Sequence, residues 1–280
     1  MSISEIGYWT EIKLDIVKKY AAAYSTILSN QKRPHLEHVY IDAFAGSGAH
    51  ISRQHGSPVS GSPINALLID PPFTEYHFID LDQDKTEILE KTIQNEITGP
   101  YNPNRVYIYH ADCNNVLTKK IFPLVRYENY RRGLCLLDPY GLHLDWEVIY
   151  TAGQMKSIEI FLNFPIADMN RNILLRDKSK ATQKQIERMN RFWGDESWKK
   201  VAYTMEGNLF GWEEKAHNQT LADAFRDRLK KVAGFAYVPE PIPMRHTKGA
   251  TVYYLFFASR IPVAAKIVTQ IFNKYRNHNS

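Results

Sequence analysis

Apolar side chains recur at helical spacing near the start of the chain. Residues 9–28 place Trp9, Ile12, Ile16 and Tyr20 three or four positions apart, with charged residues such as Lys13 on the other faces. This period predicts an amphipathic helix. We expect the helix to pack on the domain that follows it.

Further along, short apolar runs alternate with helical patterns. Runs rich in β-branched and aromatic residues, without strict polar alternation, are typical of buried parallel strands. Five such runs occupy residues 38–44, 75–81, 105–111, 133–139 and 157–164. Helices are predicted between them, from Ser62 as N-cap with Pro63 next, and over residues 84–97, 114–122 and 146–154. This alternation predicts a doubly wound α/β sheet.

The pattern changes after Pro165. Residues 166–231 are polar and mainly helical, so we interpret them as an insertion and a possible substrate-binding region. Two adjacent strands are predicted at 234–244 and 251–259, followed by a final helix over 263–275. An antiparallel hairpin that closes five parallel strands is typical of the Rossmann-like, seven-stranded class I methyltransferases. The expected domains are an N-terminal helical segment (1–33), one α/β domain (34–165 and 232–280) and the helical insertion (166–231).

The composition of the chain limits the classes of protein to which it can belong. With 44 % hydrophobic residues among 280, the chain can bury a substantial core. The first residues lack the regions of a secretory signal, and no apolar stretch reaches the length of a membrane span. We therefore expect a cytoplasmic protein without membrane contact. Cys113 and Cys135 should then stay reduced, and neither has a second Cys or a His at metal-ligand spacing, so no metal is expected.

The first predicted strand ends in a glycine turn, Asp42-Ala43-Phe44-Ala45-Gly46-Ser47-Gly48. Glycines let a backbone approach a ligand closely. Asp42 would bind the ammonium group of a methionine moiety. A dinucleotide site would carry a third glycine where Ile51 stands, so NAD is disfavoured. The turn predicts an S-adenosylmethionine site, with an ordinary strand-to-helix turn as the alternative. Its candidate cofactor-binding residues are Asp42, Phe44, Ala45, Gly46 and Gly48.

Carboxylates follow the next two strands. Asp80, with Leu81 beside it, ends the second strand, where an acid can accept hydrogen bonds from both ribose hydroxyls. Asp112 follows the third strand, where it either accepts from an adenine amino group or caps the next helix. Cys113 is either a packing residue or part of the wall around the adenine ring. These four residues complete the predicted cofactor site.

The fourth strand ends in Asp138-Pro139-Tyr140-Gly141, at the edge of the sheet where α/β ligand sites lie. This run resembles the Asp-Pro-Pro-Tyr signature of amino-directed nucleic-acid methyltransferases. In that signature the acid and a proline carbonyl bind the target amine, and the aromatic ring stacks on a flipped base. Here one proline is missing and the aromatic residue comes one position earlier. Asp138, Pro139 and Tyr140 are the candidate catalytic residues, with a plain strand-end turn as the alternative.

The net charge of +5 arises in one region. Residues 171–200 hold nine of the 35 Lys and Arg residues but only four of the 30 Asp and Glu residues. These cations could bind phosphates, and Phe192, Trp193 and Trp198 beside them could stack on bases. A solvated helix face is the alternative. The candidate nucleic-acid-binding residues are Arg171, Arg176, Lys180, Lys184 and Arg188.

In combination, these motifs resemble the three-Cys-motif partner protein family, TcmP. The resemblance rests on WTEIKLDIVKKY, Tyr40 to Gly48, Gly61-Ser62-Pro63, FIDLD at 78–82 and LLDPYG at 136–141, and it extends to about residue 172. It implies a methyltransferase-like α/β domain, mostly bacterial, that is commonly encoded beside a three-cysteine protein similar to radical S-adenosylmethionine enzymes. It implies no settled substrate. Ser47 stands where the family turn usually has a proline.

These features predict an S-adenosylmethionine-dependent methyltransferase that acts on a nitrogen of a DNA or RNA base. Asp138 and the Pro139 carbonyl would orient the amine, and little acid–base chemistry is required because the sulfonium is already a potent electrophile. One alternative is a non-catalytic module that binds the cofactor or nucleic acid for a radical S-adenosylmethionine-like partner. Another is methylation of a small molecule or a protein. The sequence indicates no oligomeric state.

Overall fold

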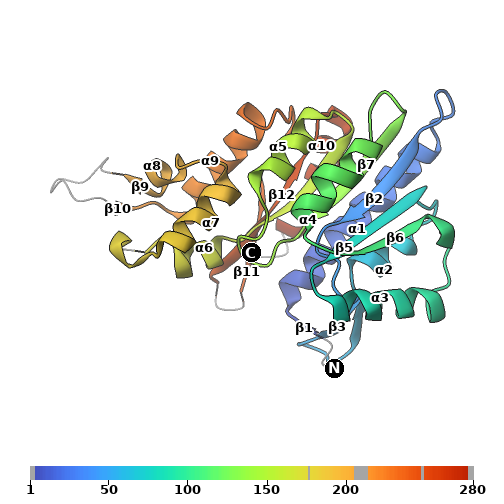
Figure 1. Cartoon of the computed structure of the whole chain (residues 1–280), viewed down its shortest axis with the longest axis horizontal. Helices are drawn as coiled ribbons and strands as arrows, with labels where there is room; N and C mark the ends of the chain where they lie inside the picture. Colours follow the sequence, from blue (N-terminus) through green and yellow to red (C-terminus); the bar gives the residue numbers. More distant parts are fainter. Residues whose placement is uncertain (1–3, 176, 205–213, 247–248, 277–280) are drawn as a thin grey trace.

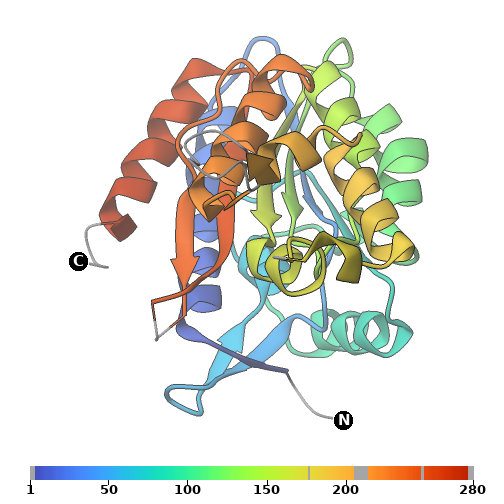
Figure 2. The same cartoon turned by 90° about the vertical axis from the view of Figure 1, so that its left-hand side faces the viewer.

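The computed structural model describes residues 4–175, 177–204, 214–246 and 249–276. A central sheet is covered by helices on both faces (Figure 1), with α1 and α10 on one side and α4 and α5 on the other (Figure 2). Within the described residues the sheet has seven strands in the order β11-β12-β8-β7-β2-β5-β6. These strands are β2 (Glu37–Asp42), β5 (Glu75–Asp80), β6 (Val106–His110), β7 (Arg131–Leu137), β8 (Ile158–Phe164), β11 (Ile242–Arg245) and β12 (Thr251–Ala258).

The strand directions match the sequence prediction. β2, β5, β6, β7 and β8 pair in parallel, β12 is antiparallel to β8, and β11 is antiparallel to β12. A parallel sheet must be buried on both faces, and every residue of β8 is indeed buried. The Rossmann-like class I methyltransferase fold with a closing hairpin is therefore confirmed.

Alternate side chains of the strands enter two separate cores. In β2, Val39 and Ile41 face one cluster, which also contains residues of α4 and α5. Tyr40 between them faces the other cluster, together with residues of α1 and α10. This alternation is the period of two that a strand imposes on its side chains. The expectation that the N-terminal helix packs on the α/β domain is confirmed by its share in the second cluster.

The helices follow their predicted positions closely. α5 has the predicted bounds, and α2 begins one residue earlier than expected, because Gly61 rather than Ser62 is its N-cap. The predicted helix at 114–122 is a short α-helix that continues as a π-helix and a 3-10 turn. The helices up to β8 and after β12 are α1 (Tyr8–Ser29), α2 (Ser62–Leu67), α3 (Gln83–Asn95), η1 (Pro103–Arg105), α4 (Cys113–Val116), η2 (Leu117–Ile121), η3 (Phe122–Leu124), α5 (Trp146–Gln154) and α10 (Pro262–Arg276).

Two strand predictions need correction. The first strand of the hairpin begins at Ile242, not at residue 234. Before it, Tyr237 makes only an isolated bridge to Ser259, and Pro239 and Pro241 offer no N–H to continue the ladder between them. The segment after the glycine turn, where no strand was predicted, contains β3 (Ala49–Ser52) and β4 (Pro58–Ser60). β3 is the middle strand of a small separate sheet and pairs with both β4 and β1 (Ser4–Ile6). The N-terminal segment is thus not entirely helical.

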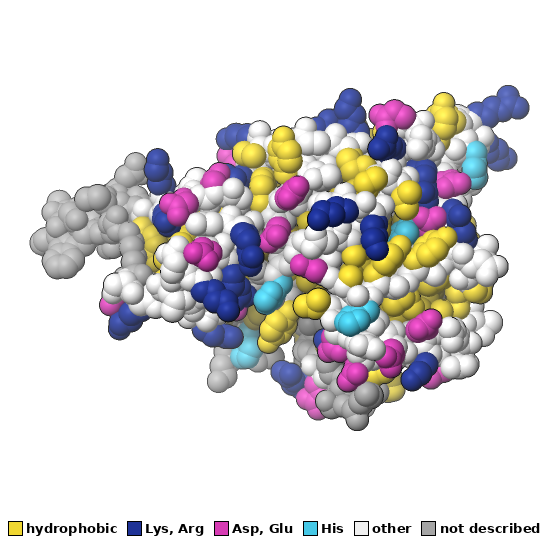
Figure 3. Space-filling view, viewed as in Figure 1, with side chains coloured by type: hydrophobic (Ala, Val, Ile, Leu, Met, Phe, Trp, Pro, Cys, Tyr) yellow, Lys and Arg dark blue, Asp and Glu magenta, His cyan; other side chains and the backbone are white. Residues whose placement is uncertain are grey.

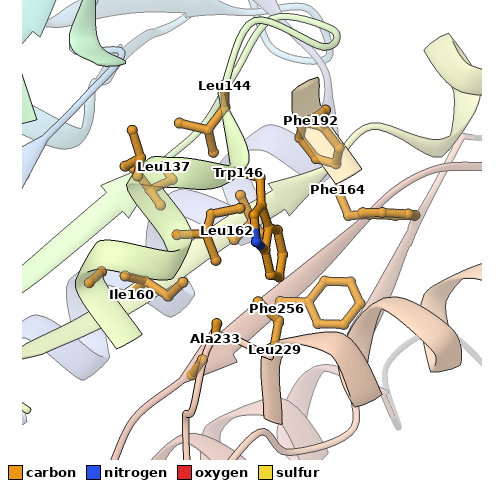
Figure 4. Packing of buried hydrophobic residues seen from close by; sticks show 14 of the residues in the cluster. Leu137, Leu144, Trp146, Ile160, Leu162, Phe164, Phe192, Leu229, Ala233 and Phe256 are labelled. Atoms are coloured by element: carbon orange, nitrogen blue, oxygen red, sulfur yellow. The ribbon is translucent and has the colours of Figure 1, made fainter. Parts of the chain in front are cut away.

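The predicted insertion is mainly helical and shares the main core. Phe192 of α7 and Leu229 of α9 belong to the same buried cluster as Phe164 and Phe256 of the sheet (Figure 4). The domain boundaries themselves stay a prediction. The elements of this region are α6 (Ile166–Asn172), η4 (Lys178–Lys180), α7 (Gln183–Trp193), α8 (Trp198–Ala202), β9 (Tyr203–Thr204), β10 (Glu214–Lys215) and α9 (Asn218–Lys231).

None of the helices in the described ranges combines the length and the apolar character that crossing a bilayer would need.

Candidate functional site

A cavity of about 650 Å³ opens at the carboxyl ends of β2, β5, β6 and β7. This edge is where open α/β sheets bind their ligands, and the volume lies in the range of small-molecule sites. The cavity brings together residues from all four predicted motifs. Among the predicted site residues, its lining includes Phe44, Gly46, Asp80, Leu81, Asp112, Cys113, Asp138 and Tyr140.

Asp80 holds the glycine turn in place. Its Oδ2 accepts a hydrogen bond from the Gly46 backbone N–H at 2.8 Å, and its Oδ1 accepts one from the Asp82 N–H at 2.9 Å. Each carboxylate oxygen has a second lone pair, so Asp80 retains acceptor capacity toward the cavity. Asp82 caps α3 by accepting from the Lys85 N–H at 3.3 Å.

The two glycines of the turn have different tasks. Gly46 has φ +63° and lines the cavity, and a Cβ built on it would meet no atom within 4 Å. A Cβ on Gly48, at φ +80°, would lie 2.7 Å from Leu89 Cδ1. Gly46 therefore leaves room for a ligand, whereas Gly48 allows α3 to pack. Gly48 and Ala45 do not line the cavity, and Ala45 is buried in the core on the α1 side.

Asp42 lies beneath the cavity instead of in its lining. Its side chain is fully buried, and its Oδ1 accepts from the Phe44 N–H at 3.2 Å. Burial raises the pKa of Asp42 to about 7, against the opposing effect of hydrogen bonds from Ser62 and Phe44. Strand β2 thus places this carboxyl group inside the fold, and its predicted contact with a methionine ammonium stays a prediction.

Asp112 caps α4, as one of its two predicted roles required. Its Oδ1 accepts from the Asn114 N–H at 2.8 Å and from the Asn114 side chain at 3.0 Å. Asn114, which the sequence reasoning missed, also binds the loop after β7, through the Asp145 N–H at 2.8 Å and the His143 carbonyl at 3.2 Å. Cys113 lines the cavity, and burial raises the pKa of its thiol to about 12, so it offers a neutral wall and no thiolate.

Asp138 is held by two other side chains. Its Oδ2 forms an ion pair with Lys13 of α1, and its Oδ1 accepts from Asn163 Nδ2 of β8 at 2.8 Å. The side chain of Lys13 is 6 % exposed and that of Asp138 is 25 % exposed. The Oδ1 oxygen of the same Asn163 amide is buried and has no hydrogen-bond partner. Asp138 is therefore a fixed carboxylate at the end of the cavity with only part of its acceptor capacity left for a ligand.

Lys13 is the most important residue that the sequence reasoning missed. The helical period put it on a polar face, yet it is buried, and its ammonium lies 5.6 Å from the centre of the Tyr253 ring. A signal was present, because Lys13 precedes the buried residues Val17, Ala21 and Tyr24 at helical spacing. His50 of β3 lines the same end of the cavity, and burial together with the Lys13 charge lowers its pKa.

The other two residues of the Asp-Pro-Tyr motif differ in exposure. Pro139 is buried and does not line the cavity. The side chain of Tyr140 is 91 % exposed at the cavity, which is unusual for a large aromatic residue. Its predicted stacking role stays a prediction, and the ring has the accessibility that such a role needs.

Basic side chains of α7 reach the cavity. Arg191 lines it and lies 3.7 Å from the Asp145 carboxylate, and Arg188 Nη2 lies 3.3 Å from His143 Nε2. Burial and the Arg188 charge lower the pKa of His143. Lys and Arg side chains gather over α6 and α7 on the face shown in Figure 3.

The other residues predicted to contact nucleic acid are four cations and three aromatic side chains. Arg171, Lys180 and Lys184 are exposed, and Arg176 lies outside the described residues. Phe192, Trp193 and Trp198 are at most 3 % exposed, so the expectation that they stack on bases is wrong. All three side chains belong to the buried core, because the amphipathic α7 turns Phe192 and Trp193 inward and α8 does the same with Trp198.

Two further observations on the described residues concern metal ligands and disulfide bonds. No group of three or more His, Cys, Asp or Glu side chains there has a geometry that could hold a metal ion. Cys113 and Cys135 are both free thiols.

Comparisons with known proteins assign no family to this chain. No model of a known protein family matches the sequence, and neither does any curated protein, so the resemblance to the three-Cys-motif partner family stays a prediction. Among solved structures, a Legionella pneumophila protein of family DUF519 has a TM-score of 0.45 at 10 % identity, covering 94 % of this chain and 91 % of that one.

Two further structures carry methyltransferase names. A Listeria monocytogenes protein assigned to the S-adenosylmethionine-dependent methyltransferases has a TM-score of 0.42 at 10 % identity, covering 87 % of this chain and 99 % of that one. The methyltransferase domain of a bacterial Hen1 protein has a TM-score of 0.40 at 9 % identity, with coverages of 87 % and 99 %. At these identities and TM-scores the likeness assigns no activity to this chain.

Proposed function

We propose that this protein is an S-adenosylmethionine-dependent methyltransferase. The observation that carries the proposal is the joining of the Gly46 turn to Asp80 at the mouth of a cavity bounded by four parallel strands. In such sheets a glycine turn and a nearby acid serve a nucleotide-like ligand. The cavity has room for one, since nothing occupies the space into which a Gly46 side chain would project.

The residues present fit this cofactor. Asp80 would accept from the ribose hydroxyls with its remaining lone pairs, and Asp112 would accept from the adenine amino group beside the neutral Cys113 wall. Leu81, whose side chain is 71 % exposed, would cover one face of the ribose or the ring. When bound, the cofactor supplies an electrophilic methyl group, so the protein mainly has to bind, align and exclude water.

Calorimetric titration with S-adenosylmethionine tests the cofactor site. We expect saturable binding that Asp80→Asn weakens about tenfold or more, because hydrogen bonds to a charged group contribute roughly 1.5–3 kcal/mol each. The matched control is Asp84→Asn in the first turn of α3, four positions after Asp80, which is outside the cavity lining and should bind normally. No heat of binding by the folded wild type would refute the proposal.

The methyl acceptor that we propose is an amino nitrogen of a nucleic-acid base. Two features support this choice. The exposed Tyr140 offers a stacking surface at the cavity, and Arg188 and Arg191 lie at the same mouth where a phosphate backbone would run. Asp138, kept in place by Lys13 and Asn163, would accept one N–H of the target amine with the lone pairs that remain.

Transfer of labelled methyl groups onto cellular DNA and RNA pools tests the acceptor. We expect incorporation by the wild type and a loss of at least a hundredfold in Tyr140→Ala, with Tyr140→Phe close to wild type because the stacking ring is kept. Tyr150→Ala is the control, since this exposed tyrosine lies outside the cavity lining. Incorporation into protein or small molecules instead would establish a different acceptor.

A second candidate function is a non-catalytic module that binds cofactor or nucleic acid for a partner protein. The occupied oxygens of Asp138 favour it, because an acceptor site with both oxygens already bonded is poorly suited to hold an amine. The partner of this proposal is a radical S-adenosylmethionine-like three-Cys-motif protein. In a deletion strain, Asp138→Ala would then restore function fully, whereas Arg188→Gln with Arg191→Gln would not.

A further inference from the structure

A second cavity lies at the opposite edge of the sheet from the proposed cofactor site. It has a volume of about 210 Å³ and is bounded by the end of α1, the first residues of β7 and β8, the end of β12 and the start of α10. A cavity of about 150 Å³ is already enough to hold a benzene molecule. This one therefore has room for a single ring with substituents.

Exposure divides the lining into a closed end and an open end. Tyr20, Tyr24, Glu159 and Ser259 line the cavity and are each at least nine-tenths buried. Ile27, Tyr127, Ile261 and Val263 also line it, and each is more than a third exposed. Apolar side chains that gather at an opening in this way mark sites that bind ligands.

The closed end holds polar groups that are not fully satisfied. Glu159 accepts from Tyr20 and from Ser259 Oγ, the latter at 2.9 Å, which leaves one lone pair on each oxygen. The buried Tyr24 hydroxyl has no hydrogen-bond partner. Leaving a buried hydroxyl without a partner is costly, and this one lines the cavity. A ligand hydroxyl there could accept from Tyr24 and donate to Glu159.

The open end is positively charged. Arg132, Lys156 and Arg260 line the cavity. The bonds that Arg132 and Arg260 make are to backbone carbonyls, and Arg132 also lies 3.7 Å from the centre of the Tyr127 ring. Among the described residues, none of the three cations forms a salt bridge. Their charge is therefore available to an anion at the mouth.

We propose that this cavity binds a small aromatic carboxylate with a hydroxyl group at its far end, a ligand of the hydroxybenzoate class. The carboxylate lies at the mouth near the three cations. The ring packs against Leu28, Leu36 and Ala264, and the hydroxyl reaches Tyr24 and Glu159. This site is separate from the proposed cofactor site and does not depend on methyl transfer.

Fluorine NMR with the full-length chain and 3-fluoro-4-hydroxybenzoate tests the proposal. We expect a saturable change of the probe signal, about fivefold weaker binding of 3-fluorobenzoate, and no saturation with 3-fluoro-4-hydroxybenzylamine, whose charge is reversed. The fivefold factor is the contribution of about one hydrogen bond.

Three variants locate the probe. Ala264→Leu fills the cavity and should abolish binding of both acids. Tyr24→Phe should show a smaller preference for the hydroxylated acid, because it removes one of the two hydrogen bonds to the ligand hydroxyl and leaves the one to Glu159. Lys266→Gln removes an exposed cation of the same helix that is outside the lining, and it should bind as the wild type does. The absence of saturation with the wild type, equal binding of the amine, or unchanged preference in Tyr24→Phe would each overturn the proposal.

Discussion

Replacing Lys13 by methionine would show how strongly the proposed acceptor site around Asp138 depends on α1. The substitution keeps most of the apolar stem but removes the ammonium, so Asp138 keeps Asn163 and loses its counter-ion. Removing one partner of a buried ion pair costs roughly 3–5 kcal/mol, because the remaining charge is left uncompensated. Asp138 is 25 % exposed and can recover some hydration. We therefore expect a loss near the lower end, about 3 kcal/mol of unfolding free energy.

A double-mutant cycle separates the pair from the loss of packing. Asp138→Asn alone leaves Lys13 buried without a partner, whereas the double variant Lys13→Met with Asp138→Asn removes both charges. Since replacing both members of a buried pair is often nearly neutral, the double variant should be more stable than either single variant. We expect a coupling of about 2 kcal/mol between the two positions.

Urea denaturation followed by circular dichroism measures these free energies. Lys18→Met is the matched control, because Lys18 is an exposed lysine of the same helix. It should change the unfolding free energy by no more than about 0.5 kcal/mol. The reasoning fails if Lys13→Met costs no more than this control, or if the two single losses simply add in the double variant.

The other predictions concern the turn, the buried acids and the basic helix. Gly48→Ala should lose about 2 kcal/mol of unfolding free energy, because its Cβ would press on Leu89 at a positive φ, and Gly46→Ala should lose less; urea denaturation compares them. Asp42 and Glu159 have pKa values raised to about 7 by burial. The unfolded chain ionises these acids near pH 4 while the folded chain still holds the protons, so both acids lower stability as the pH rises from about 4 to 7. Asp42→Asn should therefore gain stability relative to the wild type over this window, which unfolding at pH 5 and pH 8 would reveal; an unchanged difference would contradict it. Arg188→Gln with Arg191→Gln should reduce the salt dependence of nucleic-acid binding by up to about two phosphate contacts, whereas Lys91→Gln on α3 should leave it unchanged in a filter-binding titration.

The fold was predictable because its strands are buried on both faces. Continuous apolar runs such as that of β8 identify a parallel sheet without knowledge of its neighbours. The hairpin strand β11 was predicted too long, since apolar content suggested a strand where prolines prevent the ladder. The small sheet of β1, β3 and β4 was not predicted, because three or four residues carry too little pattern to indicate pairing.

At the end of the cavity where we propose the cofactor site, the positions of most residues were predictable for a related reason. The bonds that shape it are mostly local, such as Asp112 to Asn114 and Asp80 to Asp82. Residues that end parallel strands must meet at one edge, so their roles follow from position in the chain. Asp42 is the exception. It is the last residue of β2, and whether such a carboxyl points into the cavity or beneath it depends on the strand's twist and neighbours, which the sequence does not specify.

The proposed acceptor site around Asp138 depends on contacts between distant parts of the chain. Lys13 and Asp138 are 125 positions apart, and Arg188 and His143 are 45 apart. A helical period can show that position 13 faces inward, but it cannot show that the lysine there pairs with the carboxylate of Asp138. The same separation has a consequence for function. Because α1 supplies the counter-ion of Asp138, changes in the packing of α1 act on the proposed acceptor site and leave the Asp80–Gly46 contact intact. Cofactor binding and methyl transfer should therefore be separable by substitutions in α1, and a variant that binds the cofactor normally yet transfers nothing would point to this helix as part of the site.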